Sequence, residues 1–122
     1  IEAMAFDAVI DGELLIHDPK ADGFAVRPFS DLQRRLNRKT VTPALITSHP
    51  AFVRAYDLLA IGGVDLRALP FIERRRRLAE FLTSSTLSRF DLSPLVDFEG
   101  PDDLARFRIR PPAEAIEGLM LK

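Results

Sequence analysis

An apolar stretch near the start of the chain constrains the fold most, because it carries two carboxylates. Residues 8–16 read Ala-Val-Ile-Asp-Gly-Glu-Leu-Leu-Ile, and we expect a strand there. Side chains alternate between the two faces of a strand, so Asp11 and Glu13 share one face. Two carboxylates on a half-buried face are costly unless a divalent metal ion, a pair of ribose hydroxyls or a basic side chain lies beside them. The simpler alternative is a strand edge that emerges into solvent.

The composition fits one small globular domain and excludes several classes of protein. The chain has 122 residues, of which 47% are hydrophobic and 29% are charged, as is usual for such domains. No apolar run approaches the ~20 residues of a membrane span, so we expect no membrane partner. The lack of cysteine suits a reducing cytosol, and we expect a cytoplasmic location. The absence of cysteine excludes disulfides and thiolate chemistry. His17 and His49 are far apart, and we assign neither of them to metal binding or base catalysis.

Basic residues gather in two clusters, although the net charge is only −1. Only three of the 17 basic residues are lysines, and the planar guanidinium of arginine suits forked contacts to phosphate. The first cluster fits a phosphate-binding surface and a solvated helix face equally well. It consists of Arg34, Arg35, Arg38 and Lys39. For the second cluster, residues 74–77, a solvated face is the favoured interpretation.

The chain alternates strand-like and helix-like patterns on irregular connections, which predicts an α+β fold with mainly antiparallel sheet and flanking helices. Tyr56 shares one face of its predicted strand with Phe52 and Arg54, where a tyrosine usually packs. The predicted strands are 8–16, 24–26, 52–61, 92–98 and 116–122. The predicted helices are 31–37, with Ser30 as the N-cap and Leu32 and Leu36 inside, then 70–82 and 101–107. Residues 40–50 are predicted to form a loop, and Gly62-Gly63 a turn.

Three motifs in order then resemble a known family. They are Asp11-Gly12-Glu13-Leu14, Tyr56-Asp57-Leu58-Leu59 and Glu117-Gly118-Leu119-Met120-Leu121-Lys122. Together they resemble the third, third-a and fourth nucleotidyltransferase motifs of ATP-dependent DNA ligases. The stretch 29–39, and 57–59 followed by 65–67, look like the bacterial and archaeal branch of that family. The resemblance implies that residues 1–122 are part of an adenylation domain with the DNA ligase/mRNA capping enzyme nucleotidyltransferase fold.

The resemblance also implies a mechanism and a set of site residues. In the parent enzyme, a lysine attacks the α-phosphate of ATP, AMP passes to the 5′-phosphate at a nick, and the 3′-hydroxyl displaces it, as DNA repair, replication and recombination require. Tyr56 would stack on adenine, and Glu13 would hold the ribose or contribute to the metal site. Asp11 and Glu117 would hold Mg²⁺ or Mn²⁺, with Glu13 and Glu117 as the catalytic carboxylates. Lys122 would face a phosphate or would lie at a solvent-facing strand end.

Some expectations concern what this stretch lacks and what it binds. We expect the first motif, Lys-x-Asp-Gly, and the fifth motif to be absent, so that the chain alone should not form a lysyl-adenylate. The first basic cluster would contact nicked duplex DNA in a bacterial nucleoid. Exposed strand edges would favour self-association. The alternatives are an RNA ligase or capping-type nucleotidyltransferase, a non-catalytic nucleic-acid-binding remnant, and a small domain with incidental motif matches.

Overall fold

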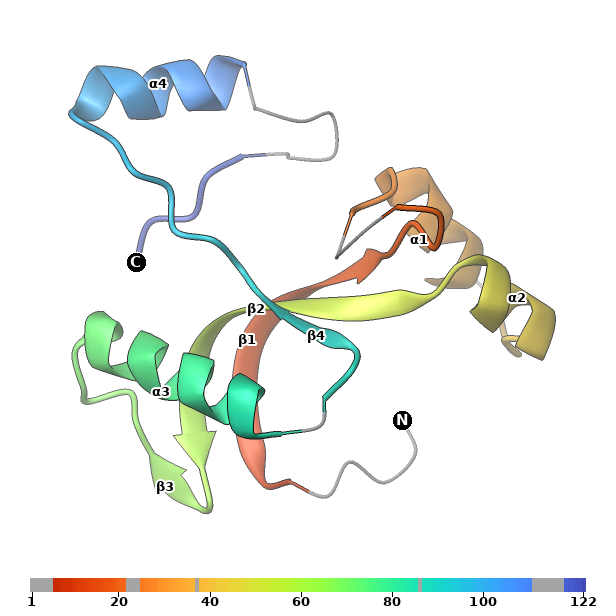
Figure 1. The fold of residues 1–122 in the computed structure, drawn as a ribbon, viewed down its shortest axis with the longest axis horizontal. Helices are drawn as coiled ribbons and strands as arrows, with labels where there is room; N and C mark the ends of the chain where they lie inside the picture. Colours follow the sequence, from red (N-terminus) through yellow and green to blue (C-terminus); the bar gives the residue numbers. More distant parts are fainter. Residues whose placement is uncertain (1–5, 22–24, 37, 86, 111–117) are drawn as a thin grey trace. The chain divides into compact units, whose positions relative to one another are not determined.

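The computed structural model describes residues 6–21, 25–36, 38–85, 87–110 and 118–122 (Figure 1). Two compact units share these residues. The first contains residues 1–14 and 52–93, and the second contains residues 15–51 and 94–122. The elements in chain order are β1 (Ala8–Ile16), α1 (Phe29–Leu36), α2 (Pro43–Ser48), β2 (Ala51–Ile61), β3 (Val64–Asp65), α3 (Phe71–Ser84), β4 (Phe90–Leu92) and α4 (Pro101–Ile109).

The long strand β2 is the centre of the sheet and pairs with β1, β3 and β4. The Gly62 N–H donates to the Asp7 carbonyl, and six residues along β1 the Glu13 side chain meets Tyr56, so β1 and β2 run antiparallel. Gly62 and Gly63 have φ angles of 56° and 76°, a left-handed conformation that suits the tight turn into antiparallel β3. The α+β prediction is confirmed. One pair differs, because β4 lies parallel to β2.

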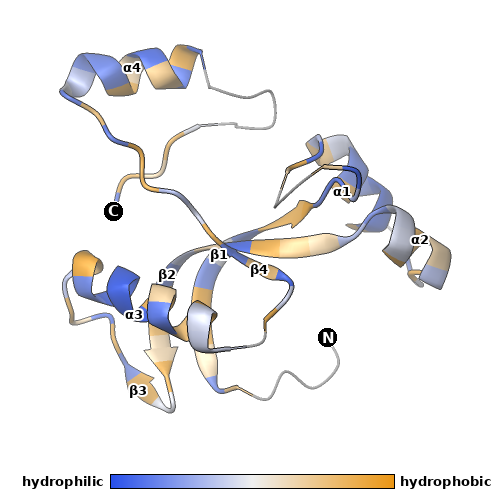
Figure 2. Ribbon diagram, viewed as in Figure 1, coloured by the Kyte–Doolittle hydropathy of each residue, from blue (hydrophilic) through white to orange (hydrophobic). Residues whose placement is uncertain are grey.

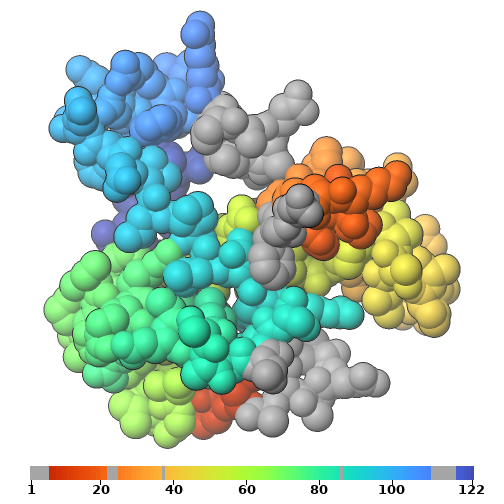
Figure 3. All heavy atoms as spheres, viewed as in Figure 1, coloured from red at the N-terminus to blue at the C-terminus, as the bar shows by residue number. Residues whose placement is uncertain are grey.

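The core of the first unit lies between β2 and α3. Ala55, Leu58, Leu66 and Leu78 are buried there and form one apolar cluster. Burial of each leucine contributes roughly 1.5–3 kcal/mol. Helix α3 also contacts β4, and in the space-filling view the atoms of these two segments form a continuous surface (Figure 3). This packing covers one face of β2 with α3, while neighbouring strands pair along its edges.

In the second unit, β1 is followed by a short return of the chain. His17 and Val26 form an antiparallel bridge, and the Arg27 N–H donates to the Ile16 carbonyl, so the described end of the strand predicted over 24–26 returns along β1. Residues 40–50 were predicted as a loop, and this is wrong for α2. Thr42 Oγ1 accepts a hydrogen bond from the Leu45 N–H, and Pro43 occupies the first turn, a favourable start for a helix.

Several predicted boundaries shift. Helix α1 begins at Phe29, so Ser30 lies inside the first turn instead of capping it, and Leu36 is 55% exposed. The strand predicted over 92–98 is wrong beyond Leu92, because β4 ends two residues before Pro94, which has no N–H for a sheet. Residues 118–122, predicted as a strand, have no regular secondary structure, and residues 116–117 lie outside the described part of the chain.

Two predicted helices are confirmed with small extensions. Helix α3 begins one residue after Pro70, and α4 begins at Pro101 with Asp102 and Asp103 in its first turn, where carboxylates favour the helix dipole. Both helices mix polar and apolar residues along their length, and the arginine-rich part of α3, which follows its apolar first residues, is its most hydrophilic part (Figure 2). None of the described helices is long and apolar enough to cross a membrane.

Candidate functional site

Glu13 and Tyr56 meet across the paired strands β1 and β2. The Tyr56 hydroxyl donates a 2.6 Å hydrogen bond to Oε2 of Glu13. Glu13 is exposed and Tyr56 is half-buried. Partial burial, and then the hydrogen bond to the Glu13 carboxylate, raise the pKa of Tyr56 well above its usual 10, so the phenol remains a proton donor at neutral pH. The structure thus brings together the two residues that the sequence placed at the adenine and the ribose.

An ion pair between β2 and β4 lies next to this contact. Arg54 is opposite Asp91 in the parallel register, and its Nε and Nη2 lie 2.9 Å and 2.7 Å from Oδ2 of Asp91. Its guanidinium carbon is 5.6 Å from the centroid of the Phe52 ring. The charge of Arg54 lowers the pKa of Tyr56, and that of Asp11 raises it.

Sequence reasoning missed Arg54 and Asp91 as site residues. Arg54 lies two residues before Tyr56 on the same strand face, and this spacing was a usable signal. Asp91 gave no such signal, because its partner is 37 residues away in the sequence and the pairing depends on the parallel register of β4.

Gly12 lets β1 approach β2 closely at this point. A Cβ added to Gly12 would lie 2.8 Å from the Arg54 carbonyl oxygen and 2.9 Å from Cγ1 of Val53. Both distances are shorter than a van der Waals contact, so a side chain would push the two strands apart. The glycine between the two acids therefore sets the separation across which Glu13 meets Tyr56.

A buried ion pair fixes the strand behind Tyr56. Asp57 is 1% exposed, and Arg74 donates to its two carboxylate oxygens at 2.8 Å each and also donates to the Leu69 carbonyl. Arg75 is buried as well and donates to the Ser93 carbonyl. The prediction of a solvated face over residues 74–77 is therefore wrong for Arg74, because the buried carboxylate of Asp57 on β2 needs a cation. It is also wrong for Arg75, which is buried against the Ser93 carbonyl.

The predicted metal ligands are only partly described. Asp11 lies on β1 and its charge acts on Tyr56, whereas Glu117 lies outside the described residues. Within the described residues, no group of three or more His, Asp or Glu side chains could hold a metal ion. Asp11 and Glu13 supply two carboxylates, which are ligands of the kind that Mg²⁺ prefers. Lys122 belongs to the second unit and is exposed.

The first basic cluster divides into structural and outward-facing residues. Arg35 donates to the His49 carbonyl at 2.7 Å and so joins α1 to the end of α2. Arg34 is 64% exposed in its side chain. Arg38 and Lys39 are also exposed. Arg38 donates back to the Arg34 carbonyl and extends the helix surface.

A buried carboxylate lies beneath this cluster. Asp31 is 8% exposed, and Oδ2 lies 2.7 Å from Nη2 of Arg27. His49, which ends α2, is also buried, and its Nε2 is 3.8 Å from Oδ1 of Asp31. Ser48 Oγ lies 2.9 Å from Nδ1 of the same histidine. The hydrogen bond from Arg35 to the His49 carbonyl and the burial of Asp31 and His49 hold α1 and the end of α2 together.

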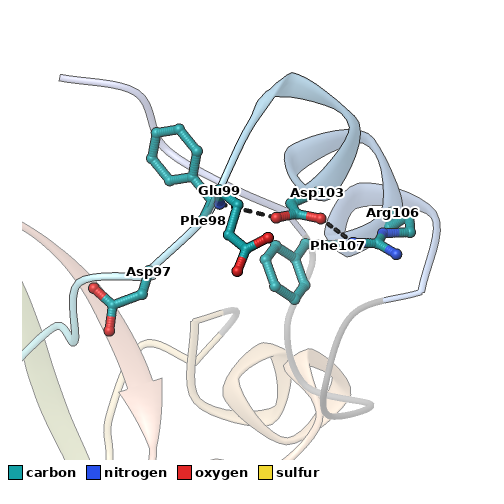
Figure 4. A pocket seen from close by; sticks show the side chains of 6 residues that line it. All are labelled: Asp97, Phe98, Glu99, Asp103, Arg106 and Phe107. Carbon is teal, nitrogen blue, oxygen red and sulfur yellow. Dashed lines mark hydrogen bonds and ion pairs between the residues drawn. The ribbon is translucent and has the colours of Figure 1, made fainter.

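The second unit also contains a hollow of about 460 Å³ next to α4 (Figure 4). Within it, Asp103 accepts a hydrogen bond from the Glu99 N–H at 2.9 Å and pairs with Arg106, as drawn in Figure 4. No residue predicted to take part in catalysis or binding lines this hollow. The lining residues are Asp97, Phe98, Glu99, Asp103, Arg106 and Phe107.

Comparison with known proteins decides the family. The family model described as "ATP dependent DNA ligase domain" matches residues 1–122. The chain belongs to the ATP-dependent DNA ligase domain family. It is 33% identical over 118 residues to a DNA ligase of Aeropyrum pernix and 30% identical over 118 residues to one of Staphylothermus marinus, covering 97% of this chain in each case. It is also 32% identical over 121 residues to a probable DNA ligase of Aquifex aeolicus, covering 99% of the chain.

The resemblance drawn from the three motifs is thereby confirmed at the level of the family. The chain spans about a fifth of the length of these relatives, 19% of the first two and 20% of the third. The α+β sheet with its flanking helices agrees with the nucleotidyltransferase domain of ATP-dependent DNA ligases. That the chain is of the bacterial type in particular stays a prediction.

The expectation that the first-motif pattern is absent needs a correction from the sequence. Lys20-Ala21-Asp22-Gly23 fits Lys-x-Asp-Gly residue by residue. Lys20 is exposed, and its N–H donates to Oδ1 of Asp18 at 3.0 Å in the turn after β1. Asp22 and Gly23 lie outside the described residues.

Proposed function

We propose that this chain forms part of the adenylation domain of an ATP-dependent DNA ligase that seals nicks through lysyl-AMP and DNA-adenylate intermediates. Membership of the ligase family supports this proposal. The observation that carries it to the residues is the 2.6 Å contact between Glu13 and Tyr56. It unites two motifs that are 43 residues apart on one face of the β1–β2 pair.

In this proposal, Tyr56 and Glu13 bind the nucleoside of ATP. The tyrosine ring offers a flat, apolar platform on which adenine can stack. The Glu13 carboxylate is exposed beside it and accepts hydrogen bonds from ribose hydroxyls. Arg54 and Asp91 neutralise each other alongside and hold β2 against β4. These contacts would orient the nucleotide with its phosphates away from the buried core.

Asp11 would hold Mg²⁺ or Mn²⁺ together with Glu117 and water, with Glu13 and Glu117 as the catalytic carboxylates. Such an ion offsets negative charge on the phosphoryl group during transfer. Asp11 and Glu13 lie two residues apart on β1, which supplies a negatively charged surface for it. We further propose that Lys122 faces a phosphate of the nucleotide.

The nucleophilic lysine is proposed to lie outside these 122 residues. In the family's motif order the Lys-x-Asp-Gly motif precedes the Asp11-Gly12-Glu13 motif, whereas Lys20 follows it in a turn. The chain alone should therefore retain no labelled AMP after incubation with radiolabelled ATP and denaturation. Label that is retained by the chain but lost in a Lys20→Ala variant would overturn this assignment.

The outward residues Arg34, Arg38 and Lys39 are proposed to contact the phosphates of nicked duplex DNA, while Arg35 supports them from within. A non-catalytic nucleic-acid-binding role would use the same surface. An RNA ligase or capping-type enzyme would share the nucleotide site. Sealing of a nicked DNA duplex by the full-length protein, compared with a nicked RNA duplex, separates these alternatives.

Calorimetric titration of ATP into the full-length protein tests the nucleotide site. We expect Tyr56→Ala to weaken binding by about tenfold or more, because the stacking surface and the hydroxyl are both lost. Phe98→Ala is the matched control, since it removes an aromatic ring that is 55% exposed in the other unit. Equal ATP binding by the unmodified protein, Tyr56→Ala and Phe98→Ala would show that Tyr56 does not bind the nucleotide.

A further inference from the structure

The hydroxyl of Tyr56 has no part in adenine stacking, yet it makes a short polar contact with Glu13. It donates to Oε2 of Glu13 at 2.6 Å. A phenol hydroxyl lies in the plane of its ring, so this bond leaves the face of the ring available to a base. In the part of the chain that the structure describes, Oε1 of Glu13 receives no hydrogen bond. Tyr56 therefore offers both a ring face for stacking and a hydrogen-bond donor to Glu13.

We propose that Tyr56 is a positioning residue for Glu13, and that its hydroxyl holds one carboxylate oxygen so that the other accepts from the ribose of the bound nucleotide. The inference rests on the proposed nucleotide-binding function and deepens it. It makes residue 56 a determinant of the choice between ribonucleotide and deoxyribonucleotide, in addition to its role in binding the base.

Three features of the structure support this coupling. Glu13 is exposed and has a long side chain that would otherwise sample several rotamers, so a charge-assisted bond to Tyr56 fixes its direction in advance. Gly12 sets the strand separation that allows the 2.6 Å contact. Arg54, the cation on the same strand face, pairs with Asp91. In the described contacts, Glu13 accepts its hydrogen bond from the phenol of Tyr56.

Pre-organisation of this kind improves binding because less freedom is lost when the ligand arrives. It acts only on groups that Glu13 contacts. The hydroxyl should therefore matter for nucleotides with ribose hydroxyls and should matter little for their deoxy counterparts. A purely structural tyrosine would affect both sugars equally.

The test uses the full-length protein and an ATP analogue in which a methylene bridges the α and β phosphorus atoms, so that binding is measured without transfer. Its 2′-deoxy and 3′-deoxy forms are titrated in parallel. The variants are Tyr56→Phe, Tyr56→Ala, Glu13→Gln and the double variant with Tyr56→Phe and Glu13→Gln. Thr83→Val is the matched control, because it removes a hydroxyl that bonds the Ala79 carbonyl within α3, away from the site.

We expect Tyr56→Phe to weaken binding of the ribonucleotide analogue by about fivefold or more and to leave binding of at least one deoxy form within about twofold. The double variant should bind no more weakly than Glu13→Gln alone, because the two groups act as one unit. If Tyr56→Phe lowers the melting temperature of the protein, Glu13→Gln tests the same coupling from the other strand.

Two other outcomes overturn the inference and are distinguishable. If Tyr56→Phe binds every analogue like the unmodified protein while Tyr56→Ala loses binding, the hydroxyl does not position Glu13 and the proposed function stands. If the unmodified protein binds none of the analogues, the proposed function fails and the inference fails with it.

Discussion

The two arginine clusters look alike in the sequence and differ in the structure. In α3, Arg74 and Arg75 turn inward to Asp57 and the Ser93 carbonyl, and Arg76 and Arg77 pair with Glu73. In and after α1, only Arg35 turns inward, to the His49 carbonyl. The α3 cluster is thus engaged within its own unit. The α1 cluster keeps an exposed positive surface in Arg34, Arg38 and Lys39.

The difference shows that a count of basic residues does not identify a phosphate-binding surface. The position of acidic partners decides whether a positive charge faces outward. Helix α3 carries Glu73 and Glu80 at the spacings of three and four residues that bring side chains together. Helix α1 carries one acid, Asp31, which is buried and lies 2.7 Å from Arg27 and 3.6 Å from Arg34.

The largest effect is expected from breaking the inward contact of the α3 cluster. Asp57→Ala removes a buried carboxylate and leaves the guanidinium of Arg74 without its main partner. We expect a loss of about 3 kcal/mol in the free energy of unfolding, measured by urea denaturation. Glu80→Ala, at an exposed ion pair on the same helix, should stay within about 0.5 kcal/mol. Similar losses of unfolding free energy for the two variants would show that the ion pair of Asp57 with Arg74 does not contribute more than an exposed pair.

The corresponding inward contact of the α1 cluster should be weaker. Asp31→Ala removes a carboxylate that is 8% exposed and leaves Arg27 and His49 without it, so we expect a loss of about 2 kcal/mol. Ser30→Ala is the neighbouring control and should change stability by less than about 0.5 kcal/mol, because Ser30 lies inside α1. A loss of about 1 kcal/mol at Ser30 would restore the N-cap predicted from the sequence.

The sequence predicted the elements whose pattern is local. Alternating and apolar runs identified β1 and β2, and Pro70 and Pro101 marked the starts of α3 and α4. Helix α2 was missed because it has only six residues, although Thr42-Pro43 marks its start. The parallel strand β4 was displaced because its register depends on contacts with residues about 37 positions earlier.

The same distinction applies to the candidate site. Glu13 and Tyr56 were predicted from motifs, and the structure brings them together on adjacent strands. The inward turn of Arg74 and Arg75 could not be read from the sequence, because their acceptors belong to β2 and to the residue after β4. Local patterns fix which residues are available. Long-range packing decides which of them are already engaged.

Binding to DNA tests whether the two arginine clusters differ in their contacts with phosphate. Replacing Arg34, Arg38 and Lys39 together by glutamine should weaken binding to a nicked duplex and reduce the salt dependence of log K by about 2–3, one for each lost phosphate contact. Arg76→Gln with Arg77→Gln is the matched control and should leave the slope unchanged, since both residues are paired with Glu73. Fluorescence anisotropy at several salt concentrations measures both. A larger effect of the α3 pair would reverse the assignment of the DNA surface.

The smallest effect concerns the acid that neutralises the α3 cluster. Hydrogen bonds from Arg76 and then Arg77 lower the pKa of Glu73 to about 2 from its usual 4.5. Since the folded-state pKa is lowered, this interaction stabilises the protein fully above about pH 4.5 and is lost as the pH falls towards 2. We expect Glu73→Gln to lower the melting temperature slightly at pH 7, with the difference shrinking below pH 4. The effect should be small because these side chains are partly exposed and solvent screens their charges. A difference that grows as the pH falls would contradict the assignment, because protonated glutamate and glutamine would then not be equivalent at this position.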